Sequence, residues 1–198
     1  MTTAITKGER TRKKLIAATG DLLRRHGFHA TGLSDIVAES GAPRGSLYFY
    51  FPGGKDELAR AALEAAGAEW RARIGAAVAS APDLDGAIAA IVKLLGDDLE
   101  ASKFQNGCPV AAVALETTSK PVHDAIAAHY AEWERGIAAH LVSVGFAAGP
   151  ARQLSVVALS MIEGALLLSR VQKSRAPLTM VGTALRAMVA ATGPKKIK

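Results

Sequence analysis

Cysteine and aromatic residues are scarce in this chain of 198 residues. The single cysteine, Cys108, allows no disulfide within the chain, which is typical of proteins from a reducing compartment such as the cytoplasm. Aromatic residues make up 5% of the sequence, against 49% for hydrophobic residues as a whole. A chain poor in aromatics and rich in alanine favours an all-α fold over a β-sandwich or a barrel.

Long uncharged apolar runs are also missing. The first residues, MTTAITKGERTRKK, contain no apolar segment and do not resemble a signal peptide. We expect residues 1–8 and the basic tail Lys195–Lys198 to be disordered. The most apolar stretch, Leu154–Leu168, is interrupted by Glu163, so the sequence predicts a buried helix and no membrane partner.

Motifs of common enzyme classes are absent as well. The sequence contains no GxxxxGK[ST], GxGxxG, HExxH or GxSxG pattern. His129 and His140 fall on one helix face, but eleven residues rise about 16 Å, which is too far for two ligands of one metal ion. The sequence therefore predicts no catalytic residue, no metal site and no cofactor.

Positive charge is concentrated near the N-terminus. Residues 1–55 hold nine Lys or Arg and four Asp or Glu, a net charge of +5, whereas residues 56–198 hold fifteen and fourteen, a net charge of +1. This asymmetry is the electrostatic pattern of a protein that binds a polyanion. A basic face that is merely solvated would give the same charge count. Sequence motifs are therefore needed to distinguish polyanion binding from a solvated face.

Residues 31–55 predict two short helices joined by a tight turn. Thr31 is a candidate N-cap, followed by an apolar stripe with helical spacing. Gly41 is expected to adopt the left-handed conformation that ends a helix, and Pro43 to occupy the first position of the next. The apolar stripe consists of Leu33, Ile36 and Val37. Two helices joined in this way are typical of a helix-turn-helix.

The second helix, residues 44–51, has two chemically different sides. Leu47 and Phe51 are four residues apart and are expected to face the core. A cation, hydroxyls and aromatic rings point elsewhere, and such groups contact phosphates and base edges of DNA. These side chains belong to Arg44, Ser46, Tyr48 and Tyr50.

Residues 10–58 resemble the DNA-binding domain of the TetR family of transcriptional repressors. The resemblance is carried by Thr11-Arg12, Gly27-Phe28, Thr31, Asp35-Ile36-Val37, Gly41, Arg44-Gly45-Ser46-Leu47-Tyr48, Phe51 and Lys55. Two further motifs are similar to the LmrA/YxaF-like branch of that family. They are Phe51-Pro52-Gly53-Gly54-Lys55, and Gly107-Cys108-Pro109-Val110 followed by Ala114-Leu115-Glu116.

The resemblance implies a nine-helix protein with a DNA-binding domain at 1–55 and a ligand-binding and dimerisation domain at 56–198. The implied DNA contacts are Arg12, Thr31, Arg44, Gly45, Ser46, Tyr48, Tyr50 and Lys55. Arg44 and Ser46 are expected to read bases, while the tyrosines, Thr31 and Lys55 hold phosphates. A histidine often stands in the family where this chain has Tyr50, and Ala42 replaces a residue that often bears a hydroxyl.

The sequence predicts a first helix that opens at the basic cluster Arg10, Arg12, Lys13 and Lys14 and runs to about His26. Beyond residue 54 it predicts six further helices. They are expected at about 55–79, 83–104, 109–118, 121–145, 150–174 and 177–192. The last two are apolar on more than one side, which indicates a homodimer formed through them. A monomer with a buried central hairpin would give the same pattern.

A ligand pocket is expected among the helices from 83 to 174. Its candidate lining residues are Phe104, Leu115, Tyr130, Trp133, Met161, Glu163 and Leu167. Glu163, a carboxylate in an apolar helix, either pairs with Arg170 or Arg152 across the dimer or meets a polar group of a ligand. Cys108 either packs at a helix entry or acts as a redox-sensing thiol.

The sequence thus favours a cytoplasmic homodimeric repressor, not an enzyme, that binds a palindromic double-stranded operator and is released by a small hydrophobic or aromatic effector. Branch resemblance implies a planar aromatic or a drug-like effector. The alternative is a small-molecule sensor or carrier for which DNA contact is secondary.

Overall fold

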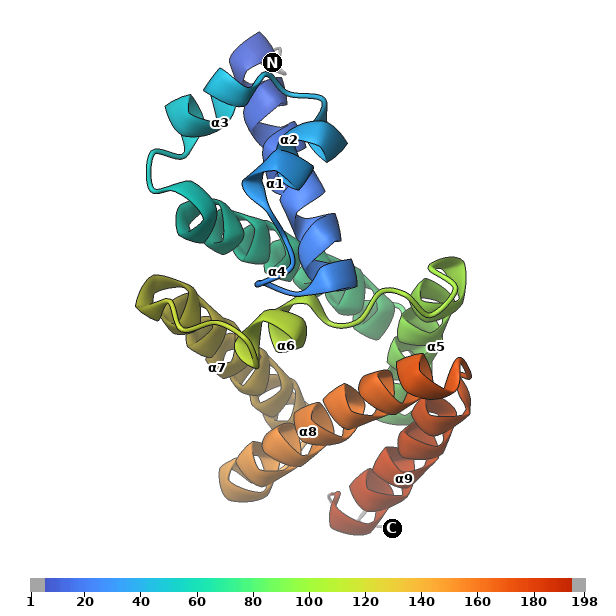
Figure 1. Ribbon diagram of the computed structural model, residues 1–198. Helices are drawn as coiled ribbons and strands as arrows, with labels where there is room; N and C mark the ends of the chain where they lie inside the picture. Colours follow the sequence, from blue (N-terminus) through green and yellow to red (C-terminus); the bar gives the residue numbers. More distant parts are fainter. Residues whose placement is uncertain (1–5, 194–198) are drawn as a thin grey trace. The chain divides into compact units, whose positions relative to one another are not determined.

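The computed structural model describes residues 6–193, and within this range it contains nine α-helices and no strand (Figure 1). The helices are α1 Lys7–His26, α2 Leu33–Ser40, α3 Arg44–Tyr50, α4 Gly54–Ala79, α5 Leu84–Ala101, α6 Pro109–Ala114, α7 Lys120–Ser143, α8 Ala148–Gln172 and α9 Ala176–Thr192. The all-α prediction is confirmed. The disorder expected for residues 1–5 and 195–198 concerns positions outside the described residues.

The helices pack into two compact units. The first comprises the described residues up to Glu69 together with Cys108–Ala127, and the second comprises Trp70–Gly107 with the described residues from Ala128 onward. Packing therefore groups α6 with the helix-turn-helix and divides α4 between the units. The functional division expected between residues 55 and 56 is a separate matter and stays a prediction.

The first unit is built on one apolar cluster. Side chains from α1, α2, α3 and α4 meet there, with Ile36, Phe51 and Leu58 completely buried. The cluster consists of Leu15, Leu22, Ile36, Ala42, Leu47, Phe51 and Leu58. Burying such side chains stabilises the unit by about 1.5–3 kcal/mol each, so helices as short as α2 and α3 are held by packing.

Helix α1 begins earlier than the sequence indicated. Thr6 is its N-cap: the Thr6 hydroxyl accepts a hydrogen bond from the Glu9 N–H (3.2 Å), and a Glu9 carboxylate oxygen accepts one from the Thr6 N–H (2.7 Å). Disorder at residues 6–8 is thus a wrong prediction, because this reciprocal pair satisfies two otherwise free N–H groups. The hydrogen bonds from Thr6 lower the pKa of Glu9.

The predicted caps of α2 and α3 are also corrected. Gly32, not Thr31, is the N-cap of α2, and its N–H donates to an Asp35 carboxylate oxygen (3.1 Å). Pro43 is the N-cap of α3, one position before the expected one. Gly41 does adopt the left-handed conformation, with φ of 61°, as predicted.

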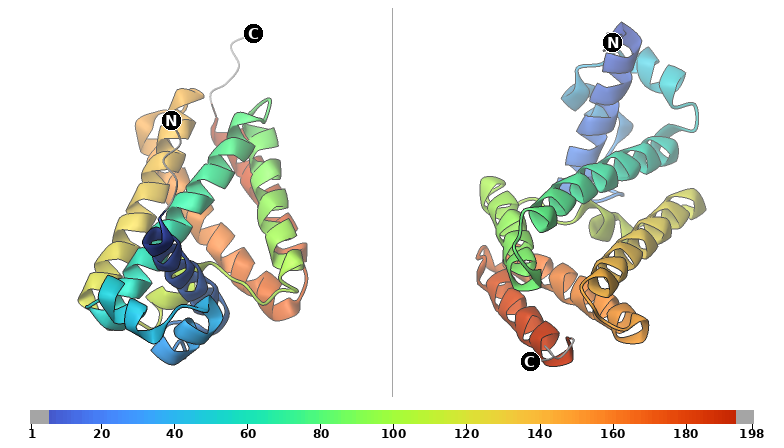
Figure 2. Two further views of the ribbon diagram at one scale, coloured as in Figure 1. Left: turned by 90° about the horizontal axis from the view of Figure 1, so that it is seen from above. Right: turned by 180° about the vertical axis from the view of Figure 1, so that it is seen from behind.

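The second unit contains the hairpin of α8 and α9, with α5 packed against both (Figures 1 and 2). One of its apolar clusters consists of Leu141, Phe146, Ala151 and Leu154. Helix α8 is long and apolar enough to cross a membrane, but only 22% of its apolar window is buried in the chain. The expectation of a buried helix is therefore wrong for the single chain: α8 packs along one side and leaves an apolar stripe exposed.

Candidate functional site

Helix α3 presents two distinct faces. Leu47 and Phe51 are 1% and 0% exposed, because they complete the core of the first unit. Tyr48 and Phe49 are 50% and 77% exposed, and Gly45 lies between them on the same outward face. A methyl group added at Gly45 would meet no atom within 4 Å. Packing inside the protein therefore does not require a glycine there.

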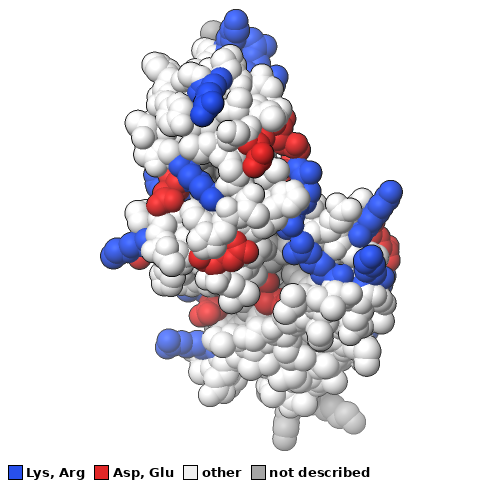
Figure 3. Space-filling view, viewed as in Figure 1, with Lys and Arg blue, Asp and Glu red and all other residues white. Residues whose placement is uncertain are grey.

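Cationic side chains without a carboxylate partner accompany this face. Arg10, Lys14 and Arg44 are exposed, and their side chains have no hydrogen bond or ion pair within the described residues. Elsewhere in the unit Arg25 pairs with Glu39 and Arg60 with Glu64. Figure 3 shows Lys and Arg side chains gathered around the N-terminal end of this unit. The available positive charge thus lies at α1 and α3, where an anion can approach.

Three other predicted DNA contacts lie close to this face. Ser46 and Tyr50 are half-buried, and the Tyr50 hydroxyl sits against Gly8 at the start of α1. Arg12 is exposed and its guanidinium lies over the Phe51 ring, 5.3 Å from the centroid. The start of α1 and helix α3 therefore belong to one surface.

Thr31 and Lys55 are held by the protein itself. Thr31 is 1% exposed, and its hydroxyl donates to the Gly27 carbonyl (2.7 Å), so it is not part of the exposed surface. The half-buried Lys55 ammonium donates to the His29 carbonyl (3.3 Å) and lies 4.4 Å from the Phe28 ring centroid. Two of its three N–H donors remain for another acceptor.

Glu116 was quoted only as part of the branch motif, and the structure gives it a role within the first unit. Its carboxylate accepts a hydrogen bond from the His29 N–H (2.9 Å), and its carbonyl oxygen accepts one from the His29 ring Nε2 (2.8 Å). The carboxylate also fills the space beside Gly27, where a Cβ atom would clash with it. The segment after α6 is thereby joined to the turn between α1 and α2.

In the second unit, three of the predicted ligand residues come together. Tyr130 and Trp133 on α7 stack edge to face, with 5.5 Å between ring centroids, and the Tyr130 hydroxyl donates to Glu163 on α8 (3.5 Å). His129 is buried beside Trp133. The Trp133 indole N–H is buried and has no hydrogen-bond acceptor among the described residues. Such a group normally signals a missing partner.

The remaining ligand candidates have no hydrogen bond or ring contact with this group. Leu115 is 90% exposed in the first unit, and Leu167 is 61% exposed on the free stripe of α8. Phe104 is half-buried in the loop after α5 with φ of 60°, and Met161 is half-buried on α8. Cys108 is half-buried at the N-cap of α6. Within residues 6–193 no group of three potential metal ligands occurs.

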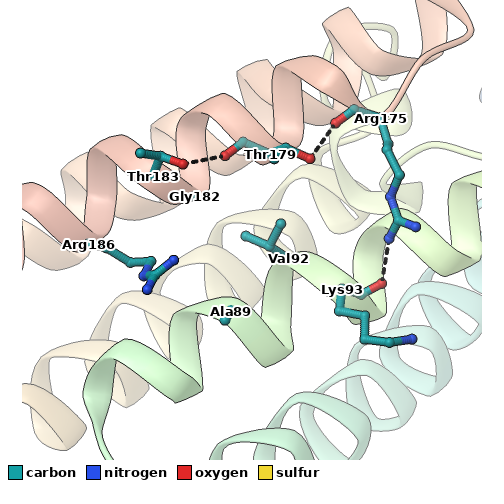
Figure 4. A pocket seen from close by; sticks show the side chains of 8 residues that line it. All are labelled: Ala89, Val92, Lys93, Arg175, Thr179, Gly182, Thr183 and Arg186. Carbon is teal, nitrogen blue, oxygen red and sulfur yellow. Dashed lines mark hydrogen bonds between the residues drawn. The ribbon is translucent and has the colours of Figure 1, made fainter.

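A shallow hollow of about 250 Å³ lies between α5 and α9 (Figure 4). Its basic side chains have carboxylate partners: Lys93 and Arg175 pair with Asp97, and Arg186 pairs with Asp85. Hydrogen bonds from Arg186 and Lys93 hold the pKa values of Asp85 and Asp97 below their ordinary range. None of the predicted ligand residues lines this hollow, and its charges are already neutralised.

A helix-turn-helix with an exposed polar face, followed by a larger helical unit, defines a DNA-binding transcriptional regulator. Residues 15–62 match the family model of bacterial regulatory proteins of the tetR family, and residues 86–184 match that of the LmrA/YxaF-like regulator C-terminal domain. The chain belongs to the TetR family. This is a family of regulators and not of enzymes, as the sequence predicted.

Relatives match over nearly the whole chain. It is 35% identical to the Bacillus subtilis regulator YxaF over 184 residues, covering 92% of this chain and 96% of YxaF. It is 34% identical to the Bacillus subtilis regulator LmrA over 176 residues, covering 88% and 94%. An uncharacterised regulator of Mycobacterium tuberculosis is 35% identical over 192 residues, covering 93% and 97%. The branch inferred from the two short motifs is confirmed.

Solved structures show the same fold. The regulatory protein TetR from Rhodobacter sphaeroides superposes with a TM-score of 0.81 at 19% identity, covering 89% of this chain and 97% of that one. A TetR-family regulator from Streptomyces coelicolor gives a TM-score of 0.73 at 27% identity, covering 90% and 95%.

Replacing Gly45 with alanine tests whether an external partner requires the glycine. Because nothing in the protein opposes a methyl group there, Gly45→Ala is expected to stabilise the protein by up to about 1 kcal/mol in urea unfolding. The same methyl group is expected to weaken DNA binding by about 1–3 kcal/mol, since it separates the backbone from the duplex.

Gly136→Ala is the matched control. Gly136 is an exposed helical glycine on α7 with equally open surroundings. It should gain similar stability without any change in DNA affinity. Wild-type DNA affinity of Gly45→Ala would refute close backbone approach.

Proposed function

We propose that this protein is a cytoplasmic homodimeric repressor that binds a palindromic operator and leaves it when a small aromatic effector binds. The observation that carries the proposal is the outward face of α3. It combines an exposed Tyr48, a bare Gly45 and an Arg44 that has no ion pair within the described residues, whereas Arg25 and Arg60 of the same unit are paired with carboxylates.

The chemistry of this face suits a duplex. Arg44 offers the forked donors that read guanine, and Tyr48 offers a hydroxyl for a phosphate oxygen. Arg10, Arg12 and Lys14 at the start of α1 supply charge for the flanking phosphates. Ser46 and Tyr50 lie on the same helix, and they and Lys55 are half-buried, so part of their surface is left for DNA.

A second copy of the chain is proposed to cover the exposed stripe of α8. Val156, Leu167, Leu168 and Val171 share one helix face and are 44% to 72% exposed. Exposed Ser160 and Gly164 lie within that stripe, and α9 adds a row of small residues, Ala184, Ala187 and Ala191. Small side chains let two helices approach closely, so α8 and α9 of both copies can form a four-helix interface.

The effector is proposed to bind at Trp133. The buried indole N–H needs an acceptor, the Tyr130 and Trp133 rings offer apolar faces, and Glu163 offers a carboxylate. A planar aromatic molecule that carries a hydrogen-bond acceptor for the indole N–H and a donor for the carboxylate satisfies all of these groups.

Glu116 is proposed to link effector binding to the DNA-binding unit. It fixes His29, and the carbonyl of His29 receives the Lys55 ammonium. A shift of the segment after α6 would therefore change the α1–α2 turn and the position of Lys55. An effector that favours the shifted conformation lowers the population that fits the operator.

The operator experiment tests the function directly. Fluorescence anisotropy with the duplex from immediately upstream of the gene should show tighter binding than with a scrambled duplex, at low and at moderate salt. Arg44→Ala should cost about 1–3 kcal/mol on the cognate duplex. Arg60→Ala, which removes an arginine already paired on α4, should cost little. Equal, salt-sensitive binding to both duplexes would instead favour the small-molecule carrier.

The dimer is tested by placing a charge in the stripe. Wild-type protein should sediment at about twice the chain mass of 20.5 kDa. Leu167→Glu should sediment as a monomer, because a carboxylate would be buried without a partner. Leu115→Glu adds the same charge at a more exposed leucine outside the stripe and should remain dimeric. A dimeric Leu167→Glu would exclude this interface.

The effector site is tested with Trp133→Phe, which keeps an aromatic ring and removes the N–H. A panel of planar aromatic compounds is first screened for release of the labelled operator. The variant should bind DNA normally. It should need about threefold to tenfold more of an active compound to release the operator, which corresponds to the free energy of one hydrogen bond. Trp70→Phe serves as the control, since Trp70 packs against Arg73 instead. Unchanged sensitivity of Trp133→Phe would place the effector elsewhere.

A further inference from the structure

Phe49 is the most exposed aromatic side chain among the large hydrophobic residues at the surface, at 77%. It lies on α3, whose buried side is already completed by Leu47 and Phe51. A solvent-facing phenyl group contributes nothing to the core, and surface aromatic residues are enriched where a partner binds. The polar residues predicted to contact DNA do not account for it.

The ring of Phe49 is held in place before any partner arrives. It packs edge to face against Tyr50, with 4.9 Å between centroids and an angle of 86° between the ring planes. Tyr50 is half-buried against the core of the first unit. Phe49 therefore offers an apolar contact of fixed position, whose ordering costs little on binding.

Gly45 lies one helical turn before Phe49, so the two share a face. Because Gly45 has no side chain, a partner that approaches the backbone there meets the Phe49 ring directly. The partner must also suit the phenol of Tyr48 and the Arg44 guanidinium, which has no ion pair within residues 6–193. The partner must therefore carry negative charge and also present an apolar group within a groove that admits helix α3.

We propose that Phe49 reads thymine, by van der Waals contact with the C5-methyl group in the major groove. This inference rests on the proposed operator-binding function. The thymine methyl group is the apolar group that base pairs display in that groove, and phenylalanine is among the side chains that contact it. A phenyl group has no donor or acceptor, so it cannot bind a phosphate or the polar edge of a base. The contact distinguishes thymine from cytosine, which lacks the methyl group.

Uracil scanning tests this contact, because it removes only the methyl group. The probe is a duplex that the wild-type protein selects from a random-sequence pool, remade with each thymine in turn replaced by deoxyuridine. Replacing one particular thymine in either half-site is expected to weaken binding of the protein about fourfold, because burying one carbon group contributes about 0.8 kcal/mol. Replacing both should give about sixteenfold.

Phe49→Ala should bind the uracil and thymine duplexes equally at that position, while Phe49→Leu should retain part of the preference. Tyr48→Phe removes a neighbouring hydroxyl and should leave the thymine preference unchanged. Thermal unfolding of Phe49→Ala should match wild type, because the ring is exposed.

The outcomes separate this inference from the function on which it rests. A selected duplex without any uracil-sensitive thymine, or a preference that persists in Phe49→Ala, overturns the thymine contact and leaves the regulator intact. Weakening of Phe49→Ala by the same factor on the thymine and the uracil duplex, relative to wild type, also overturns it, because the ring would then contact a part of the duplex other than the methyl group. Failure of the wild-type protein to select any duplex overturns both proposals.

Discussion

Burial of Leu47 and Phe51 is the constraint on which the DNA-binding unit depends. Helix α3 has seven residues, far too few to be stable alone in water. It exists because these two side chains, four residues apart, enter the cluster formed by α1, α2 and α4. Fixing that side fixes the opposite side as well, so Gly45, Tyr48 and Phe49 have to face outward. The surface proposed to recognise DNA is thus a consequence of core packing.

The periodicity of apolar residues predicted the helices well. Competition between local hydrogen bonds explains where the helix ends differ from the prediction. Apolar spacing and glycine or proline positions located nine helices within a few residues. Thr31 was misjudged because its hydroxyl can either accept from the following turn or donate to a preceding carbonyl, and Gly27 supplied that carbonyl. The Asp35 carboxylate then took the capping role. Sequence spacing cannot rank two such hydrogen bonds, since each is available to the same residue.

The candidate site residues also divide into those that sequence spacing predicts and those that it misses. Arg44 and Tyr48 could be chosen from the helix-turn-helix pattern, because their helix face follows from spacing alone, whereas Gly45 came from the family resemblance. Phe49 was overlooked, although the same spacing places it outside the buried pair. Contacts between distant segments had no local signal: Glu116 and His29 are 87 residues apart. The motif Ala114-Leu115-Glu116 marked the segment, but only its packing beside Gly27 explains why a carboxylate stands there.

Two features of the structure are not explained by a single chain, and the proposed dimer accounts for both. Helix α8 leaves an apolar stripe in solvent, although its composition indicated burial on more than one side. Helix α3 is so short that it can reach only a few base pairs. A two-fold axis through α8 and α9 would bury the stripe and present two copies of α3 to half-sites about 34–36 Å apart. DNA affinity would then depend on the spacing between the two units, so a small rearrangement within each chain could control it.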